Sequence, residues 1–245
     1  MIRWITDTAK AIWFFLKFAT VIILGYLVMM GVLWLLQQPM VTEFKRSSVG
    51  VWDFFERFET AVTVSGWLFL LTFGLHFLDR YLFRQRLLKF GRIFSKGFFP
   101  LVKMFTFPFF HGNFSHLRGT ASLTVLFAGL AVMIIPSLTL VVQVAIIMFL
   151  VQGFGVWIFG KRGTPHVGSS GLMLGLFSFD VLFGILELGW QTAVALLLLY
   201  LFGKGMFRTL TDRSPNTSVE AHFWGFASGL VIAYFVSPFG PLSIY

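Results

Sequence analysis

Long, nearly uncharged apolar segments most constrain how this 245-residue chain can fold. A helix needs about 20 apolar residues to cross the hydrocarbon core of a bilayer. The segments of about that length are 11–36, 61–79, 115–135, 138–160, 168–187, 189–207 and 219–237. A series of such segments, joined mostly by short connections, is typical of a polytopic membrane protein. The sequence therefore predicts an all-α protein that crosses the membrane seven times.

Composition excludes several other classes of protein. Hydrophobic residues make up 57% of the chain and charged residues 12%, whereas about 25% of the residues in a soluble domain are charged. This balance excludes a water-soluble enzyme, a disordered chain and a fibrous protein. The lack of cysteine excludes a disulfide-built domain and a site with cysteine metal ligands. Because the five histidines are dispersed, we expect no metal and no cofactor.

Residues 37–60 separate the first apolar segment from the others. Within them, the patch VWDFFERF at 51–58 has apolar residues near helical spacing, which is typical of a short helix lying in the membrane interface. A plain loop is the alternative. We therefore divide the chain into an N-terminal part, 1–60, with a transmembrane helix and an interfacial segment, and a six-helix core, 61–245. The last five helices are expected to pack as antiparallel neighbours, because their connections are short.

Basic residues are concentrated on one predicted side of the membrane. The net charge is +9, and the connection at 80–110 interleaves Lys and Arg with Phe and Leu. That pattern also occurs in nucleic-acid binding, but between two spans it favours contact with anionic lipid, so no nucleic-acid partner is expected. With alternating spans, the loops 80–110, 161–167 and 208–218 lie on the basic side, which the positive-inside rule places in the cytoplasm. We predict a bacterial cytoplasmic membrane protein, with an organellar inner membrane as the alternative.

Three polar residues lie where apolar helices are predicted to begin. They are His116, Ser170 and His222, near the starts of the third, fifth and seventh segments. With alternating spans, these three ends share one side of the bilayer and one depth. Polar groups inside a membrane are costly, so each is a functional candidate. A single residue of this kind is more often a packing or hydrogen-bonding residue.

Two GxxxG patterns offer a means of bringing the fifth and seventh helices together. The glycines are Gly171 and Gly175 in the fifth segment and Gly225 and Gly229 in the seventh. Small residues four apart let two helix backbones approach closely. If these faces meet, Ser170 comes near His222, and a nucleophile and its base must lie within about 2.6–3.2 Å. Generic helix packing is the alternative explanation.

Three motifs in this region resemble those of the rhomboid family of intramembrane serine proteases. The stretch GTPHVGSSGLMLG at 163–175 resembles the G-x-S-G motif of the nucleophilic serine. The stretch AHFWGFASG at 221–229 resembles the A-H-x-x-G-x-x-x-G motif of the histidine base, and HGNFSHL at 111–117 resembles the H-x-x-x-x-H-L start of the second core helix. The motifs stand in the family's order, and the resemblance covers about 61–237.

The resemblance implies a six-helix rhomboid-like bundle, here with one extra N-terminal transmembrane helix, and a Ser-His dyad. Ser170 would attack a peptide bond and His222 would take its proton. His116 and the backbone N–H of Ser170 would stabilise the oxyanion. The family usually has Asn where this chain has Thr120, whose hydroxyl is a single, shorter oxyanion donor. Many members carry an aromatic residue where this chain has Leu174.

No carboxylate is placed to complete a catalytic triad with Ser170 and His222. Asp180 follows Ser170 by ten residues, which is about 15 Å along one helix. Glu220 precedes His222 by two residues and so faces another direction. We therefore expect helix packing to orient the imidazole. His166, just before the serine motif, is expected to be a solvated loop histidine, and a role at the mouth of the active-site cavity is the alternative.

The leading hypothesis is an intramembrane serine endopeptidase that cleaves transmembrane-helix substrates. The alternative, motivated by Thr120 and Leu174, is a catalytically weak or inactive rhomboid-like protein. It would bind transmembrane helices as an assembly factor or as an accessory subunit of a larger membrane complex. A transporter or channel would need a polar path through the whole bilayer, whereas the polar groups here, apart from Asp180 and His76, gather at one end. The expected partners are transmembrane protein substrates and the lipid bilayer, with anionic lipid at the basic loops.

Overall fold

The computed structural model describes Leu16, Ile23 and residues 49–96, 101–135, 137–160, 163–214 and 217–242. Apart from Leu16 and Ile23, the predicted first span at 11–36 lies outside the described residues. The long helices are α3 (Val49–Phe77), α6 (Phe114–Ile134), α7 (Leu138–Phe159), α8 (Ser170–Leu186), α9 (Trp190–Thr211) and α10 (Val219–Val236). The shorter elements are the π-helix η1 (Leu78–Leu82), α4 (Arg86–Gly91), β1 (Ile93–Phe94), α5 (Leu101–Thr106), the 3₁₀-helix η2 (Phe107–Phe109) and β2 (Pro165–His166).

Five helical segments of the described chain are long and apolar enough to cross a membrane. They are Asp53–Leu82, Phe114–Ile134, Leu138–Phe159, Trp190–Thr211 and Val219–Val236. The prediction of an all-helical protein with several spans is therefore confirmed for the described part, in which the only strands are the two-residue β1 and β2. The predicted fifth span is the shorter apolar helix α8, with 17 residues.

Helix α8 is the centre of the bundle. It contacts α6, α7, α9 and α10, and most of its residues are buried, including Phe179 and Phe183. At 1.5 Å per residue the helix is about 26 Å long, which is less than the thickness of about 30 Å of a hydrocarbon core. A helix surrounded by protein does not have to reach both lipid surfaces. Its shortness is consistent with a Ser170 that lies below the membrane surface.

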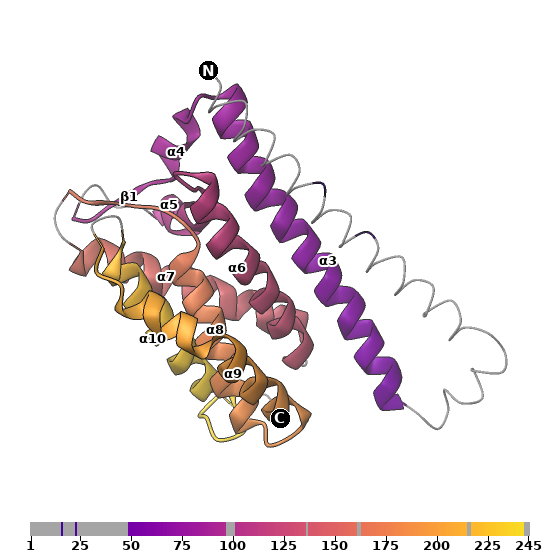
Figure 1. Ribbon diagram of the computed structural model, residues 1–245. Helices are drawn as coiled ribbons and strands as arrows, with labels where there is room; N and C mark the ends of the chain where they lie inside the picture. The colour runs from indigo at the N-terminus through magenta and orange to yellow at the C-terminus, as the bar shows by residue number, and fades with distance from the viewer. Residues whose placement is uncertain are drawn as a thin grey trace.

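The second predicted span begins earlier than expected. Instead of a separate interfacial helix at 51–58 and a span from 61, one continuous helix, α3, runs from Val49 to Phe77 and packs against α6 (Figure 1). Its charged residues fit a helix, because Asp53 and Arg57 form an ion pair of 2.9 Å one turn apart. Arg57 Nη1 also donates to the carbonyl of Ile135, the residue that follows α6, at 2.9 Å. The domain division at residue 60 stays a prediction.

The basic connection at 80–110 is folded in its described part. The buried carboxylate of Asp79 accepts from two backbone N–H groups at the start of α4, at 2.8 and 3.0 Å, and so caps that helix. Strand β1 pairs antiparallel with β2, with Ile93 opposite His166. The carbonyl of Phe107 in η2 accepts from the N–H of Gly168 at 3.0 Å. This connection is thus fixed to the chain that leads into α8.

Helices α8 and α10 cross with their backbones in contact. A Cβ atom added at Gly225 would collide with the carbonyl oxygen of Gly171. One added at Gly229 would collide with the carbonyl oxygen of Gly175. Only glycine permits this approach, so the two GxxxG patterns of the sequence meet at one crossing.

Candidate active site

Ser170 and His222 meet directly above the glycine crossing. Ser170 is the first residue of α8, and His222 lies in the first turn of α10. Ser170 Oγ and His222 Nε2 are 2.9 Å apart, which is within the reach that a nucleophile and its base require. Ser170 is 9% exposed and His222 4% exposed. The structure therefore brings the predicted pair together at a buried position.

A backbone carbonyl orients the imidazole of His222. His222 Nδ1 lies 2.8 Å from the carbonyl oxygen of Thr209, in the last turn of α9. Because a carbonyl oxygen can only accept, Nδ1 carries the proton and Nε2 is left as an acceptor for the Ser170 hydroxyl. Carbonyls in the last turn of a helix lack intrahelical partners and are available for such a bond. Sequence reasoning missed Thr209, since every residue has a carbonyl group.

The ring of His116 lies against the backbone that leads to Ser170. Asn113 caps α6 by accepting from the N–H of His116 at 2.8 Å. A Cβ atom at Gly168 would lie 2.7 Å from His116 Cε1, and Gly168 has φ +113°, a conformation that favours glycine. The His116 ring therefore lies beside Gly168, which precedes the predicted nucleophile Ser170 by two residues.

Thr120 contacts the residue before the predicted nucleophile. Its Oγ1 lies 3.1 Å from Ser169 Oγ and 3.2 Å from His111 Nε2, and it donates to the carbonyl of His116 at 2.9 Å. A hydroxyl has one hydrogen. In this arrangement Thr120 contacts Ser169, and its hydrogen is directed at the carbonyl of His116.

A second serine–histidine pair lies beside the first. His111 Nε2 is 3.0 Å from Ser169 Oγ, and it also accepts from the backbone N–H of Ser169 at 3.3 Å. Burial, which is the larger cause, and the neighbouring imidazoles of His116 and His76 together lower the pKa of His111 to about 3. His111 is thus neutral at neutral pH. The spacing of the two histidines in HGNFSH drew attention to this segment of the sequence. It did not predict that His111 contacts Ser169.

The family model of the Rhomboid domain matches residues 99–239, which is more than half of the chain. The chain belongs to the rhomboid family. Its members are mostly serine proteases. The match begins at 99, so α3 lies outside it, although the motif resemblance was expected to extend from about residue 61.

Three mycobacterial relatives are similar to this rhomboid protein. Uncharacterized proteins of Mycobacterium tuberculosis (strain H37Rv) and Mycobacterium bovis are each 28% identical over 138 residues, which cover 53% of this chain and 57% of the relative. An uncharacterized protein of Mycobacterium leprae is 29% identical over 139 residues, 53% of this chain and 54% of the relative. The chain thus spans little more than half the length of the curated relatives that it matches.

His166 of the rhomboid domain is buried, so the prediction of a solvated loop histidine was wrong. It is 4% exposed, and its ring contacts three hydroxyl groups, those of Ser95, Thr164 and Ser218. The pairing of β2 with β1 places this ring between the 80–110 connection and the start of α10. Such long-range pairing is not visible in the local sequence.

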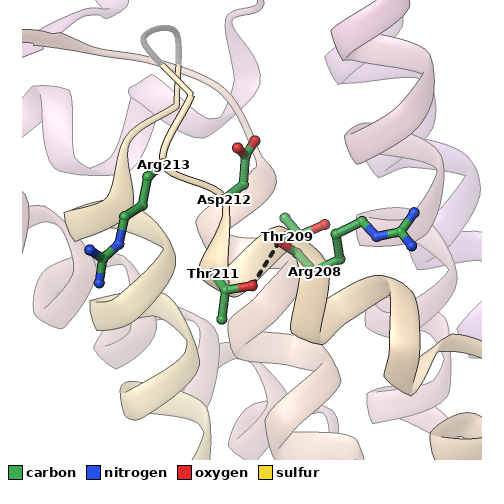
Figure 2. A pocket seen from close by; sticks show the side chains of 5 residues that line it. All are labelled: Arg208, Thr209, Thr211, Asp212 and Arg213. Carbon is green, nitrogen blue, oxygen red and sulfur yellow. Dashed lines mark hydrogen bonds between the residues drawn. The ribbon is translucent and has the colours of Figure 1, made fainter.

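A hollow of about 500 Å³ lies at the C-terminal end of α9 (Figure 2). It is lined by Arg208, Thr209, Thr211, Asp212 and Arg213. Its two arginine side chains extend in opposite directions (Figure 2). Asp212 accepts from the N–H of Ser214 at 2.9 Å and from Thr217 Oγ1 at 2.8 Å, and the bond from the Ser214 N–H contributes most to lowering the pKa of Asp212. Thr209, whose carbonyl orients the base, therefore borders a polar surface.

Proposed function

We propose that this rhomboid protein is an intramembrane serine endopeptidase that hydrolyses peptide bonds of transmembrane helices. The observation that carries the proposal is the contact of 2.9 Å between Ser170 Oγ and His222 Nε2, with Nδ1 bonded to a carbonyl. This arrangement selects the tautomer that a general base needs. A serine and a histidine that met only through packing would not require it.

The chemistry follows from the position of each proton. As Ser170 Oγ attacks the substrate carbonyl carbon, its proton moves to His222 Nε2. The imidazolium keeps its Nδ1–H bond to the carbonyl of Thr209, and the negative end of the α9 dipole favours its charge. Nε2–H then protonates the leaving amine, and the C–N bond breaks. A water molecule, deprotonated by His222, hydrolyses the acyl-enzyme and regenerates Ser170.

The start of α8 supplies a donor for the oxyanion. The first N–H groups of a helix have no intrahelical partner and carry partial positive charge, and Ser170 is the first residue of α8. We assign the Ser170 N–H to the oxyanion, together with the ring of His116. Thr120 becomes a third donor only if its hydroxyl turns from the carbonyl of His116. Donors of this kind often supply the largest catalytic effect.

The membrane setting determines the substrate and the route of water. Water has to reach Ser170 from one membrane surface, because the hydrocarbon core holds none. A transmembrane substrate has to unwind locally before its carbonyl is accessible, so small or helix-breaking residues near the cleaved bond are favoured. We place the six-helix core and the predicted N-terminal span in a bacterial cytoplasmic membrane. The mycobacterial relatives and the basic loops, which suit anionic lipid, support this location.

A rhomboid-like module that binds transmembrane helices without cleaving them is the second candidate. The engagement of Thr120 with Ser169 and His116 favours it, because it leaves fewer free oxyanion donors. In that case the protein would serve a larger membrane complex. The dyad geometry favours the endopeptidase.

Covalent labelling of the purified protein with a fluorophosphonate probe tests the proposal. We expect wild type to be labelled and both Ser170→Ala and His222→Ala to lose labelling while they keep their melting temperatures within a few degrees. Ser169→Ala is the matched control, and it should still form the adduct even if more slowly. Labelling that persists in Ser170→Ala would contradict the proposal. Absence of labelling in folded wild type would also contradict it, and capture of a transmembrane partner unaffected by Ser170→Ala would then support the binding module.

A further inference from the structure

A hydrogen bond joins the two chain segments that carry Ser170 and His222. His166 precedes Ser170 by four residues, and Ser218 precedes His222 by four residues. His166 Nδ1 is bonded to Ser218 Oγ at 2.5 Å. The glycine crossing holds α8 and α10 together after the dyad, and this bond holds the two segments together before it. Ser170 and His222 thus lie between two contacts of the α8 and α10 segments, the His166–Ser218 hydrogen bond and the glycine crossing.

The protons of this network have one consistent order. Ser95 Oγ donates its single hydrogen to the carbonyl of Val156 in α7 at 2.9 Å, so it accepts from His166 Nε2–H at 2.7 Å. Thr164 Oγ1, 2.9 Å from the same nitrogen, shares this N–H as a second acceptor. Nδ1 of His166 is then an acceptor and receives the hydrogen of Ser218 Oγ. Ser218 Oγ in turn accepts from the N–H of Ala221 at 3.2 Å, which caps α10. Bonds that point in one direction along a chain strengthen one another.

The network is anchored on both sides of His166. Ser95 is 1% exposed, and its backbone N–H donates to the carbonyl of Thr164 at 3.2 Å. At the other end, the carbonyl of Ser218 accepts from the N–H of His222 at 3.1 Å. The orientation of Ser218 therefore sets the first turn of α10, from which the base projects.

We propose that His166 is a positioning residue that holds the nucleophile and base segments in register through Ser218. The inference rests on the proposed function, since it assumes that the dyad is chemically active. Burial keeps the pKa of His166 below its usual value, although the Glu220 carboxylate raises it, so the neutral form that the network requires prevails at neutral pH. His166 does not touch substrate and acts only through geometry.

Two variants of His166 separate its hydrogen bond from its bulk. His166→Phe keeps a ring and removes both nitrogens, whereas His166→Asn retains an acceptor close to the position of Nδ1. We expect labelling by the fluorophosphonate probe to slow by about tenfold or more in the Phe variant, since small displacements of reacting groups have large effects on rate. The Asn variant should recover most of the rate. In cleavage of a transmembrane substrate, the Phe variant should lower kcat and leave KM nearly unchanged.

A matched control separates positioning from general stability. Ser65, which lies outside the family match, donates to the carbonyl of Val125 at 3.2 Å between α3 and α6. Ser65→Ala should lower the melting temperature slightly and leave the labelling rate of the folded protein unchanged. His166→Phe combined with Ser218→Ala should be no slower than Ser218→Ala alone, because both remove the same bond.

The outcomes separate the two proposals. If wild type and His166→Phe label at equal rates per folded molecule, or if the Asn variant is as slow as the Phe variant, the positioning role of His166 is wrong while the dyad stands. If folded wild type is not labelled at all, the proposed function fails, and the positioning role fails with it.

Discussion

Two adjacent serines, Ser169 and Ser170, each lie about 3 Å from a histidine nitrogen, yet only one pair has the arrangement of a nucleophile and its base. His111 Nε2 is already shared with the backbone N–H of Ser169 and with Thr120. His222 Nε2 faces the Ser170 hydroxyl, and its other nitrogen is held by the carbonyl of Thr209. The comparison shows that distance alone does not distinguish the two pairs. We take His222 as the proposed base because, among the described contacts, its Nε2 faces only the Ser170 hydroxyl.

The largest expected effect comes from removing each serine in turn. Ser170→Ala should lower the cleavage rate of a transmembrane substrate by on the order of 10⁴-fold or more, because the nucleophile is lost. Ser169→Ala should lower it far less, because its hydroxyl only supports the chain before the nucleophile. Initial rates in proteoliposomes measure both. Equal losses in the two variants would show that the two pairs act as one unit.

The next largest effect is expected from Thr120→Asn, which changes the neighbour of the second pair. The side-chain amide of Asn reaches further than a hydroxyl and has two N–H donors. One can therefore bind the oxyanion while the other keeps the contact with Ser169. We expect faster labelling of Ser170, by up to about 10²-fold, which is the value of one oxyanion donor. Labelling kinetics of wild type and the Asn variant provide the measurement. An unchanged or slower rate would indicate that Thr120 acts through Ser169 alone.

A larger side chain at the glycine crossing of α8 and α10 should disturb the Ser170–His222 pair more than the Ser169–His111 pair. Gly225→Ala places a methyl group against the carbonyl of Gly171 and should lower the free energy of unfolding by about 1–3 kcal/mol, with a loss of labelling. Gly205→Ala in α9 is the control, because its Cβ would have open space and alanine favours a helix by roughly 0.5–1 kcal/mol. Thermal unfolding in detergent compares the two. A neutral Gly225→Ala would contradict the close crossing.

Near neutral pH, the smallest effect should be the pH dependence that the second pair introduces. The pKa of His111 is about 3 in the folded protein and about 6.5 when unfolded, so the unfolded state binds more protons between these values. Stability should therefore fall as the pH drops below about 6.5 and continue to fall towards pH 3. His111→Asn should flatten this slope. Melting temperatures measured across the pH range test the expectation, and an equal slope in both proteins would refute it.

Much of the fold was predictable because membrane insertion depends on local composition. The apolar segments from 61 onwards correspond to α3 and to α6 through α10, and the family was recognisable from three short motifs. The limits of α3 were not predictable. Asp53 and Arg57 resembled an interfacial patch in isolation, but pairing with each other and with Ile135 allows one continuous helix.

The candidate site was predictable only where a residue type carries the chemistry. Ser170 and His222 were singled out by their types, their depth and the glycines beside them. The burial of His166 and the contact of His111 with Ser169 were missed, because both depend on how residues 93–95 and 107–111 pack against the chain before α8.

The sequence alone determined that the chain is a membrane protein, that it has rhomboid motifs, and which serine and histidine are the candidates. These properties depend on side-chain chemistry and on spacing within single helices. Only the tertiary structure decided which partner each histidine has. The carbonyl that orients His222 and the hydroxyls that surround His166 come from segments distant in the sequence, and they become neighbours only when the helices pack.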